Sequence, residues 1–309
     1  MAPKSTLGIQ RRASSLIIPA AAAMLLSVSS GSLGAAPPKP PVELEPAGPW
    51  NLHYEDESCK LRRNFGQEDG QIFIEMTKFG PGEKFQLIIL GKPLKSAIAS
   101  GRYTIAFGAL PPHQGSSTMA AVASTGVDVA ILNMSDFAPS DPGIAPESDW
   151  RNFTPPTTIT PVQRAAIRTV TITIGKKNVF VLKTGPLNPP LAAMDKCLDE
   201  LVRSWGVDPT IPITNAARPK TDPGTWFTSK DYPKSPLRQG KTGVVHFRLS
   251  IDQAGAVTQC SVQRAVNESD FAAETCRLLT KRARLEPARD ISGKPVAGYF
   301  LSSVRYALP

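Results

Sequence analysis

The sequence predicts an α+β protein of two domains: a mostly β N-terminal domain with a terminal helix, and a small C-terminal domain of order β-β-α-β. The chain has 309 residues, more than the roughly 100–200 that one core usually serves. Apolar residues alternate with a period of two in several stretches, and helical spacing is clear in only two. Thirty prolines, about twice the usual share, favour turns and linkers over long helices.

Residues 1–36 have the organisation of a secretory signal peptide. Three basic side chains precede an apolar run at 16–28, and a tail of small residues ends at Ala36. An uncleaved membrane anchor is the alternative, but this run is shorter than the about 20 apolar residues that span a bilayer. We therefore expect export, and removal of the leader lowers the formal net charge from +9 to +6. Export argues against a nucleic-acid partner, and a solvated surface is the simplest account of the remaining charge.

A proline-rich linker at 37–49 precedes the predicted N-terminal mixed β/α domain at 50–207. The stretch at about 111–161 is assigned to no element. A helix is expected from Asn188, as its cap, to Gly206, as its end. A second linker follows at 208–228. Alternation and turn residues predict strands in the N-terminal domain at 50–54, 71–77, 84–90, 168–174 and 178–183.

Four cysteines are present, and no two of them have the spacing of a CxxC motif. An even number of cysteines in an exported chain favours disulfide bonds over a redox or zinc site. Cys197 lies beside the apolar stripe of the predicted helix. A bond from Cys197 to Cys59 would tie that helix to the first strand region of the domain.

The C-terminal domain, predicted at 229–309, has the clearest pattern. Residues 243–252 alternate, with Val245 and Phe247 on one face and His246, expected to be solvated, on the other. A turn leads to a second strand at 256–265, a helix follows through Arg282, and a closing strand covers 297–308. A small sheet with one helix across it is therefore expected.

These residues resemble the C-terminal domain of the TonB family of periplasmic energy transducers. The matching features are Tyr232-Pro233, GVVHFRLSID at 243–252, Gly255 with the strand VTQCSV, the helix FAAETCRLL, KRARLEPA at 281–288 and Gly293-Lys-Pro295. They cover about a quarter of the chain, and their order and spacing carry the likeness. The resemblance implies a periplasmic protein that binds partners and has no catalytic residues.

Domains of this family capture a short extended segment, the TonB box, of outer-membrane transporters. A sheet edge can do this because its unpaired backbone groups accept an incoming strand. The resemblance makes 296–307 that edge and gives the partner-binding residues as Tyr232, Pro233, Val296, Tyr299, Leu301 and Arg305.

The alternatives are that these side chains simply complete the sheet, or that the edge pairs with a second copy as a homodimer. The chain also lacks the long proline-rich spacer of a transducer, and its membrane anchor is uncertain from the sequence. Partner binding is therefore expected ahead of energy coupling at the inner membrane. An exported structural or wall-binding envelope protein is the rival interpretation.

The remaining cysteines, Cys260 and Cys276, lie on the second strand and on the helix of this domain. A helix packed on a strand can bring two Cα atoms to the ~5.5–6 Å that a disulfide requires. We expect this bond to stabilise a domain that is too small for a large core.

No catalytic, metal or cofactor motif is found in the sequence. The histidines His53, His113 and His246 lie far apart, and the chain has no GxSxG, HExxH, phosphate-binding or dinucleotide fingerprint. An enzyme housed in 50–207 is the least favoured hypothesis. We therefore predict a binding protein without a cofactor.

Overall fold

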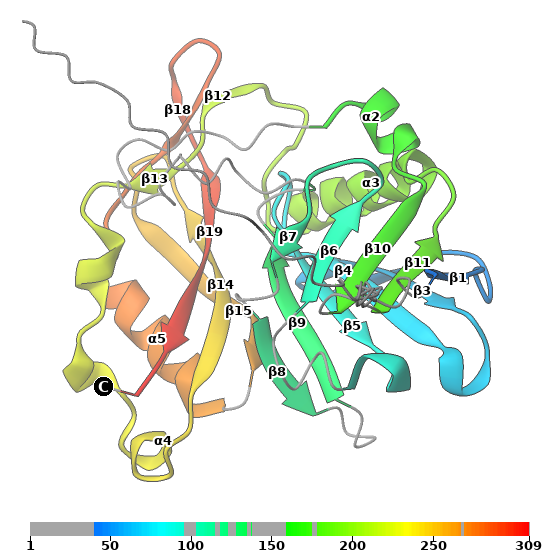
Figure 1. Cartoon of the computed structure of the whole chain (residues 1–309). Helices are drawn as coiled ribbons and strands as arrows, with labels where there is room; N and C mark the ends of the chain where they lie inside the picture. Colours follow the sequence, from blue (N-terminus) through cyan, green and yellow to red (C-terminus); the bar gives the residue numbers. More distant parts are fainter. Residues whose placement is uncertain are drawn as a thin grey trace, which may run out of the picture. The chain divides into compact units, whose positions relative to one another are not determined.

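The computed structural model describes residues 40–95, 103–114, 118–122, 128–134, 137, 159–174, 178–266 and 269–308 (Figure 1). Residues 39–309 form one compact unit. The expected signal peptide and most of the unassigned stretch lie outside the described residues. No helix among the described residues is both long and apolar enough to cross a membrane.

An antiparallel sheet of six strands forms the first part of this unit. Its order is β2 (Asn51–Glu55), β3 (Ser58–Phe65), β4 (Ile72–Lys78), β5 (Phe85–Leu90), β9 (Asp128–Met134) and β8 (Thr118–Val122). Strands β4 and β5 are buried along almost their whole length, so both of their faces are covered. One face carries apolar side chains such as Leu61, Ile74 and Leu87, which enter the main core. The buried polar residues Glu75, Thr77 and Gln86 lie in the same strands.

A second sheet and two helices complete this core. The sheet has the order β1 (Val42–Leu44), β11 (Asn178–Lys183), β10 (Thr169–Ile174), β6 (Tyr103–Phe107) and β7 (His113–Gln114). The helices are α2 (Pro161–Ala166) and α3 (Asn188–Ser204). The apolar stripe of α3, which includes Leu191, Met194 and Leu198, is buried in the core. Gly206, with φ of 78°, ends α3 as expected.

The C-terminal part has the predicted order β-β-α-β. The strands β14 (Gly243–Ile251) and β15 (Val257–Val266) form a hairpin, α5 (Ser269–Arg282) follows, and β19 (Gly298–Tyr306) closes the sheet beside β14. Phe247, Leu249 and Ile251 of β14 enter a core with Leu279 of α5. The apolar face that alternation predicts for residues 243–252 is therefore the face that α5 covers.

Residues 208–228, expected to be a linker, contain structure that belongs to this C-terminal part. The strand β12 (Ile213–Asn215) pairs with β17 (Ala288–Asp290), and β13 (Arg218–Pro219) pairs with β16 (Leu285–Glu286). After these strands, the short helix η4 (Pro223–Trp226) places Trp226 in the core, 2% exposed and 6.1 Å from the ring of Phe300. The small strand β18 (Pro295–Val296) completes the sheet of β12 and β17.

The structure also differs from the sequence expectations at several single elements. Strand β3 lies in a charged stretch where no strand was predicted, and β1 lies within the first expected linker. The predicted cap Asn188 is wrong, because Leu187 is the cap residue of α3 and makes no side-chain capping bond. Helix α2, in contrast, has a complete capping box between Thr160 and Gln163 that we did not predict.

Candidate functional site

The candidate site is the outer edge of β19. The sheet order is β15-β14-β19, and β19 pairs with β14 from Gly298↔Ile251 to Tyr306↔Gly243. Within the described residues, no strand pairs with the opposite side of β19. Every second residue of an edge strand directs its N–H and C=O away from the sheet. The edge of β19 therefore offers a row of backbone donors and acceptors.

On the face of the sheet that α5 covers, packing fixes the side chains of β19. Phe300 and Val304 pack in the core, and the ring of Tyr306 stacks on Phe271 at 4.3 Å between centroids. The Tyr306 hydroxyl lies 2.9 Å from the hydroxyl of Thr275, which is itself buried. These contacts hold β19 firmly in the sheet.

The other face of β19 lies against the first part of the unit. The ring of Tyr299 meets that of Trp205, which follows α3, at 5.0 Å between centroids. Leu301 lies directly over Gly80, where a Cβ atom would come within 2.3 Å of its side chain. Two of the predicted partner-binding side chains thus pack inside the chain. Arg305, in contrast, is exposed together with Ser302 and Ser303.

The structure separates the remaining predicted site residues. Tyr232 lies at the end of β19, because its ring contacts that of Tyr306 at 5.7 Å and its hydroxyl donates to the carbonyl of Lys241. Pro233 follows it and is the cap residue of the short helix α4 (Lys234–Arg238). Val296 does not lie on β19, since it pairs with Ala288 in the sheet of β17 and β18. The edge strand therefore begins at Gly298 rather than at Val296.

The sheet face opposite α5 was expected to be solvated, and it is covered. The ring of His246 stacks on Phe79 at 4.6 Å and its Nε2 lies 3.3 Å from Gln86 Nε2. Gln263 of β15 donates to the carbonyl of Phe79 at 2.6 Å. The prediction that His246 faces water is wrong, because the second face of the six-stranded sheet takes the place of solvent.

Arg248 is the central residue of this interface and is only 3% exposed. Its guanidinium donates to both carboxylate oxygens of Glu57, at 3.2 and 2.9 Å, and to two serine hydroxyls. It also lies 4.6 Å from the ring centroid of Trp205. A buried charge with this many partners is compensated, and removing one partner would leave the other uncompensated.

Burial of His246 predicts a pH dependence of stability. Desolvation, and then the positive charge of Arg264, lowers the pKa of His246 from 6.5 to about 4. The unfolded chain takes up this proton near pH 6.5 and the folded chain only near pH 4, so the free energy of unfolding falls as pH drops through that window. We expect a loss of about 3 kcal/mol below pH 4. Denaturant unfolding from pH 7 to 4 should show a smaller loss in His246→Gln, and equal losses would refute burial of the neutral ring.

Both expected disulfides are present. Cys59 and Cys197 join β3 to α3 with their Cα atoms 6.2 Å apart, and both side chains are buried. Cys260 and Cys276 join β15 to α5 with a Cα separation of 5.5 Å and are half-buried. All four cysteines are thus paired as the sequence predicts.

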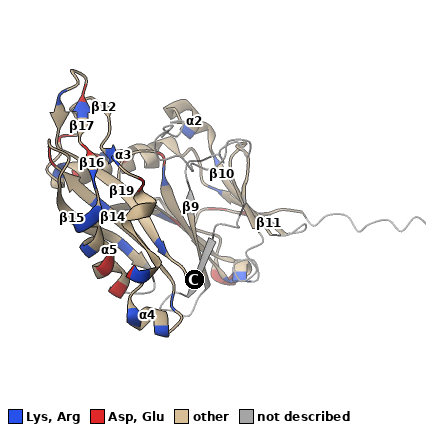
Figure 2. Cartoon of the chain, turned by 90° about the vertical axis from the view of Figure 1, so that its left-hand side faces the viewer, with Lys and Arg blue, Asp and Glu red and all other residues tan. Residues whose placement is uncertain are grey.

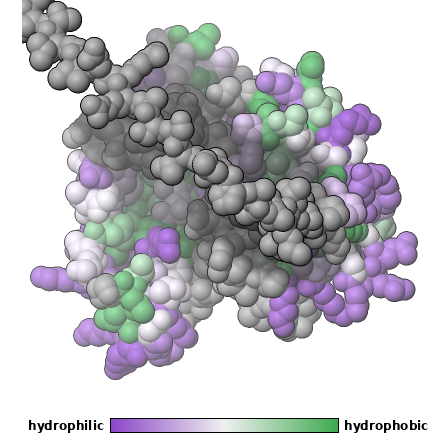
Figure 3. Space-filling view, viewed as in Figure 1, coloured by the Kyte–Doolittle hydropathy of each residue, from purple (hydrophilic) through white to green (hydrophobic). Residues whose placement is uncertain are grey.

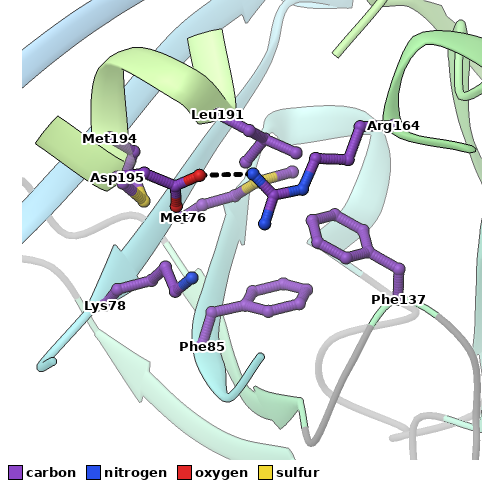
Figure 4. Close-up of a pocket in the computed structure, with 8 residues that line it drawn as sticks. All are labelled: Met76, Lys78, Phe85, Phe137, Arg164, Leu191, Met194 and Asp195. Carbon is purple, nitrogen blue, oxygen red and sulfur yellow. Dashed lines mark hydrogen bonds and ion pairs between the residues drawn. The ribbon is translucent and has the colours of Figure 1, made fainter. Parts of the chain in front are cut away.

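A small pocket lies beside α3 in the first part of the unit (Figure 4). Arg164 contacts Asp195 and lies 3.7 Å from Glu83, and burial lowers the pKa of the neighbouring Lys78. Because opposite charges meet here, the cluster serves to hold α2 and α3 on the sheet. The pocket is lined by Met76, Lys78, Phe85, Phe137, Arg164, Leu191, Met194 and Asp195. Among the described residues, no three His, Cys, Asp or Glu side chains gather as metal ligands.

The family comparison agrees with the geometry of the C-terminal part. The family model of the Gram-negative bacterial TonB protein C-terminal matches residues 228–308. No curated protein matches the chain. The matched stretch includes β14, β15, α5 and β19, together with Tyr232. Domains of this family belong to cell-envelope proteins, bind protein partners such as outer-membrane transporters, and are not enzymes. The chain is therefore a protein with a TonB-family C-terminal domain.

Proposed function

We propose that the chain is a periplasmic adaptor that binds an extended segment of an outer-membrane transporter, or of another envelope protein, along the edge of β19. The observation that carries this proposal is that, in the part of the chain that the structure describes, no strand pairs with the outer side of β19 in the sheet β15-β14-β19. Backbone pairing supplies affinity in this mode of binding, and alternate side chains supply specificity. No catalytic side chain is needed for it.

The packing of β19 supports the proposal. Phe300 and Tyr306 hold the strand from the helix side, and Tyr299 and Leu301 hold it from the side of Trp205 and Gly80. A strand fixed on both faces loses little conformational freedom when a partner pairs with its edge. We therefore assign Tyr299 and Leu301 to positioning of the strand. Arg305 and the exposed Ser302 and Ser303 are the side chains free to contact the partner.

The experiment compares two adjacent proline variants of the full chain, Ser302→Pro and Ser303→Pro. Neighbouring residues of a strand direct their amides to opposite sides, so one variant removes an amide bonded to β14 and the other removes an amide on the free edge. We expect the edge variant to keep the unfolding midpoint but lose at least tenfold in affinity for TonB-box peptides. The other variant should lower the midpoint.

Affinity is measured by calorimetry, and the midpoint by thermal unfolding. Absence of binding by the folded wild-type chain, or equal binding by the edge variant, would overturn the proposal. Self-association that the edge variant abolishes would instead assign the edge to a homodimer.

Adaptor binding does not require energy coupling at the inner membrane. Coupling needs residues 16–28 to stay in that membrane, whereas cleavage near Ala36 leaves a free periplasmic protein. N-terminal sequencing of the exported chain separates these two forms, and we expect the cleaved one.

A further inference from the structure

An isoleucine stands at the apex of the hairpin formed by β17 and β18. Ile291 directly follows β17 and is 71% exposed. Turns usually carry Gly, Pro, Asn, Asp or Ser, because these residues suit the backbone conformation or hydrogen-bond within the turn. An apolar side chain that remains mostly in water contributes little to the stability of the fold. Figure 1 draws this hairpin projecting at the top of the view, where the chain leads into β19.

The strand next to this hairpin adds further exposed apolar side chains. Ile213 of β12 pairs with Asp290, the residue before Ile291, and Thr214 donates to the carbonyl of Asp290 at 2.9 Å. Ile213 is 42% exposed, and Ile211, two residues before it, is 40% exposed. We call Ile211, Ile213 and Ile291 the isoleucine tip. Figure 3 shows hydrophobic surface at the top of the view, where Figure 1 draws the hairpin.

The turn that carries Ile291 is held by its own hydrogen bonds. The carboxylate of Asp290 accepts from the Ser292 amide at 2.9 Å, from the Ser292 hydroxyl at 2.6 Å and from the Lys294 amide at 3.0 Å. The Asp290 amide donates to the carbonyl of Lys294 at 3.1 Å, and Gly293, with φ of 78°, adopts the left-handed conformation in this turn. A tip ordered in this way loses little conformational freedom when it binds a partner.

Charged side chains flank the isoleucine tip without giving it a large net charge. Arg289 and Lys294 are exposed on the two sides of the turn, and the Arg289 guanidinium donates to the carbonyl of Gly293 at 2.8 Å. Figure 2 shows basic residues in blue in this part of the chain, beside β12 and β17. Asp290 offsets one of the two cations. The apolar side chains, rather than the charge, therefore determine what the hairpin can bind.

We propose that the isoleucine tip inserts into the interface of a lipid bilayer. A projecting tip is buried only by a surface that deforms around it or by a pocket of matching shape, so the flat face of a second copy would cover little of it. Apolar side chains at the end, with cations beside them, match a bilayer, because lipid phosphates lie just outside the acyl chains. In an apolar pocket of a protein, Arg289 and Lys294 would lose water without gaining a partner. The tip does not use the edge of β19, so this proposal is independent of the proposed function.

The test places an environment-sensitive dye on the tip of the full chain. Both native cysteine pairs form disulfides, so Ser292→Cys supplies a single thiol for a nitrobenzoxadiazole label. Gln239→Cys, at an exposed position after α4, carries the same label as a control. With phosphatidylcholine vesicles, with or without phosphatidylglycerol, we expect a blue shift and a severalfold gain in emission at 292 and neither change at 239. Binding through residues 1–36 would not separate the two labelled positions, so the difference between them reports the tip.

Substitutions in the tip test whether the isoleucines drive insertion. We expect Ile213→Ser/Ile291→Ser, in the chain labelled at 292, to require at least tenfold more lipid for the same gain in emission, because both side chains lose the free energy of leaving water. Val162→Ser is the matched control, since it removes a side chain that is 79% exposed in α2, and it should respond as the parent chain does. Both variants should keep the unfolding midpoint.

Three results would overturn the proposal: no response at 292 with either kind of vesicle, equal responses at 292 and 239, or a full response of the isoleucine variant. Analytical ultracentrifugation without lipid tests a second copy as the occupant. Self-association that Ile213→Ser/Ile291→Ser abolishes, together with a dye at 292 that ignores vesicles, would assign the tip to a contact between two chains instead.

Discussion

Replacing Cys59 and Cys197 by alanine should lower the free energy of unfolding by about 5 kcal/mol. This bond joins positions separated by 138 residues, and in the chain-entropy model the stabilisation grows with the length of the closed loop. The sulfur atoms are also buried, so their loss leaves unfilled space in the core. Equilibrium denaturation of the folded variant in guanidinium measures the change.

The second disulfide provides the matched control. Cys260 and Cys276 are separated by only 16 residues and are half-buried, so the double alanine variant should lose about 3 kcal/mol. A larger loss for Cys260→Ala/Cys276→Ala than for the long-range pair would contradict this account of the two bonds.

Arg248→Ala is expected to cost about 3–5 kcal/mol of unfolding free energy. The substitution leaves Glu57 without its partner at a buried interface and removes the guanidinium that lies over Trp205. The comparison is Arg218→Ala, because Arg218 is also paired at 2.6 Å, with Glu286, but its side chain is 62% exposed. The exposed pair should contribute less than about 1 kcal/mol. Equal effects of the two substitutions would show that the interface of Arg248 is open to water.

The Arg248 interface also explains why two domains expected from the sequence lie in one compact unit. His246 and Arg248 alternate with apolar residues, as polar residues do on the solvent-facing side of a strand. That pattern only reports that one face is polar, and it does not distinguish water from the polar face of another sheet. Glu75 and Gln86 were equally ambiguous, because each stands between two apolar residues in a strand. Only the three-dimensional structure shows that the polar face of β14 meets the polar face of the six-stranded sheet.

Other elements were predictable to the degree that their signals are local. The hairpin of β14 and β15 and the helix α5 follow from alternation, a turn and helical spacing within about 40 residues. Strand β3 was missed because Lys60, Arg62 and Arg63 hide the alternation of Cys59, Leu61 and Phe65. Trp226 was assigned to a linker because short strands such as β12 and β13 depend on partners about 70 residues away.

The family resemblance predicted the edge strand, but the strand begins at Gly298 and not at Val296. The sequence run from Val296 reads as a single strand, but the chain changes sheets at Ala297, between β18 and β19. The family resemblance also implied that Tyr299 and Leu301 contact the partner, but their side chains contact Trp205 and Gly80. The exposed Arg305 keeps the role expected of it as a proposal.

Hydrogen exchange along β19 tests the central proposal most directly. Saturating TonB-box peptide should slow exchange of alternate amides between Gly298 and Tyr306, those directed away from β14, and leave the outer edge of β15 unchanged. Binding that leaves those β19 amides exchanging at their free rates would contradict strand addition at this edge.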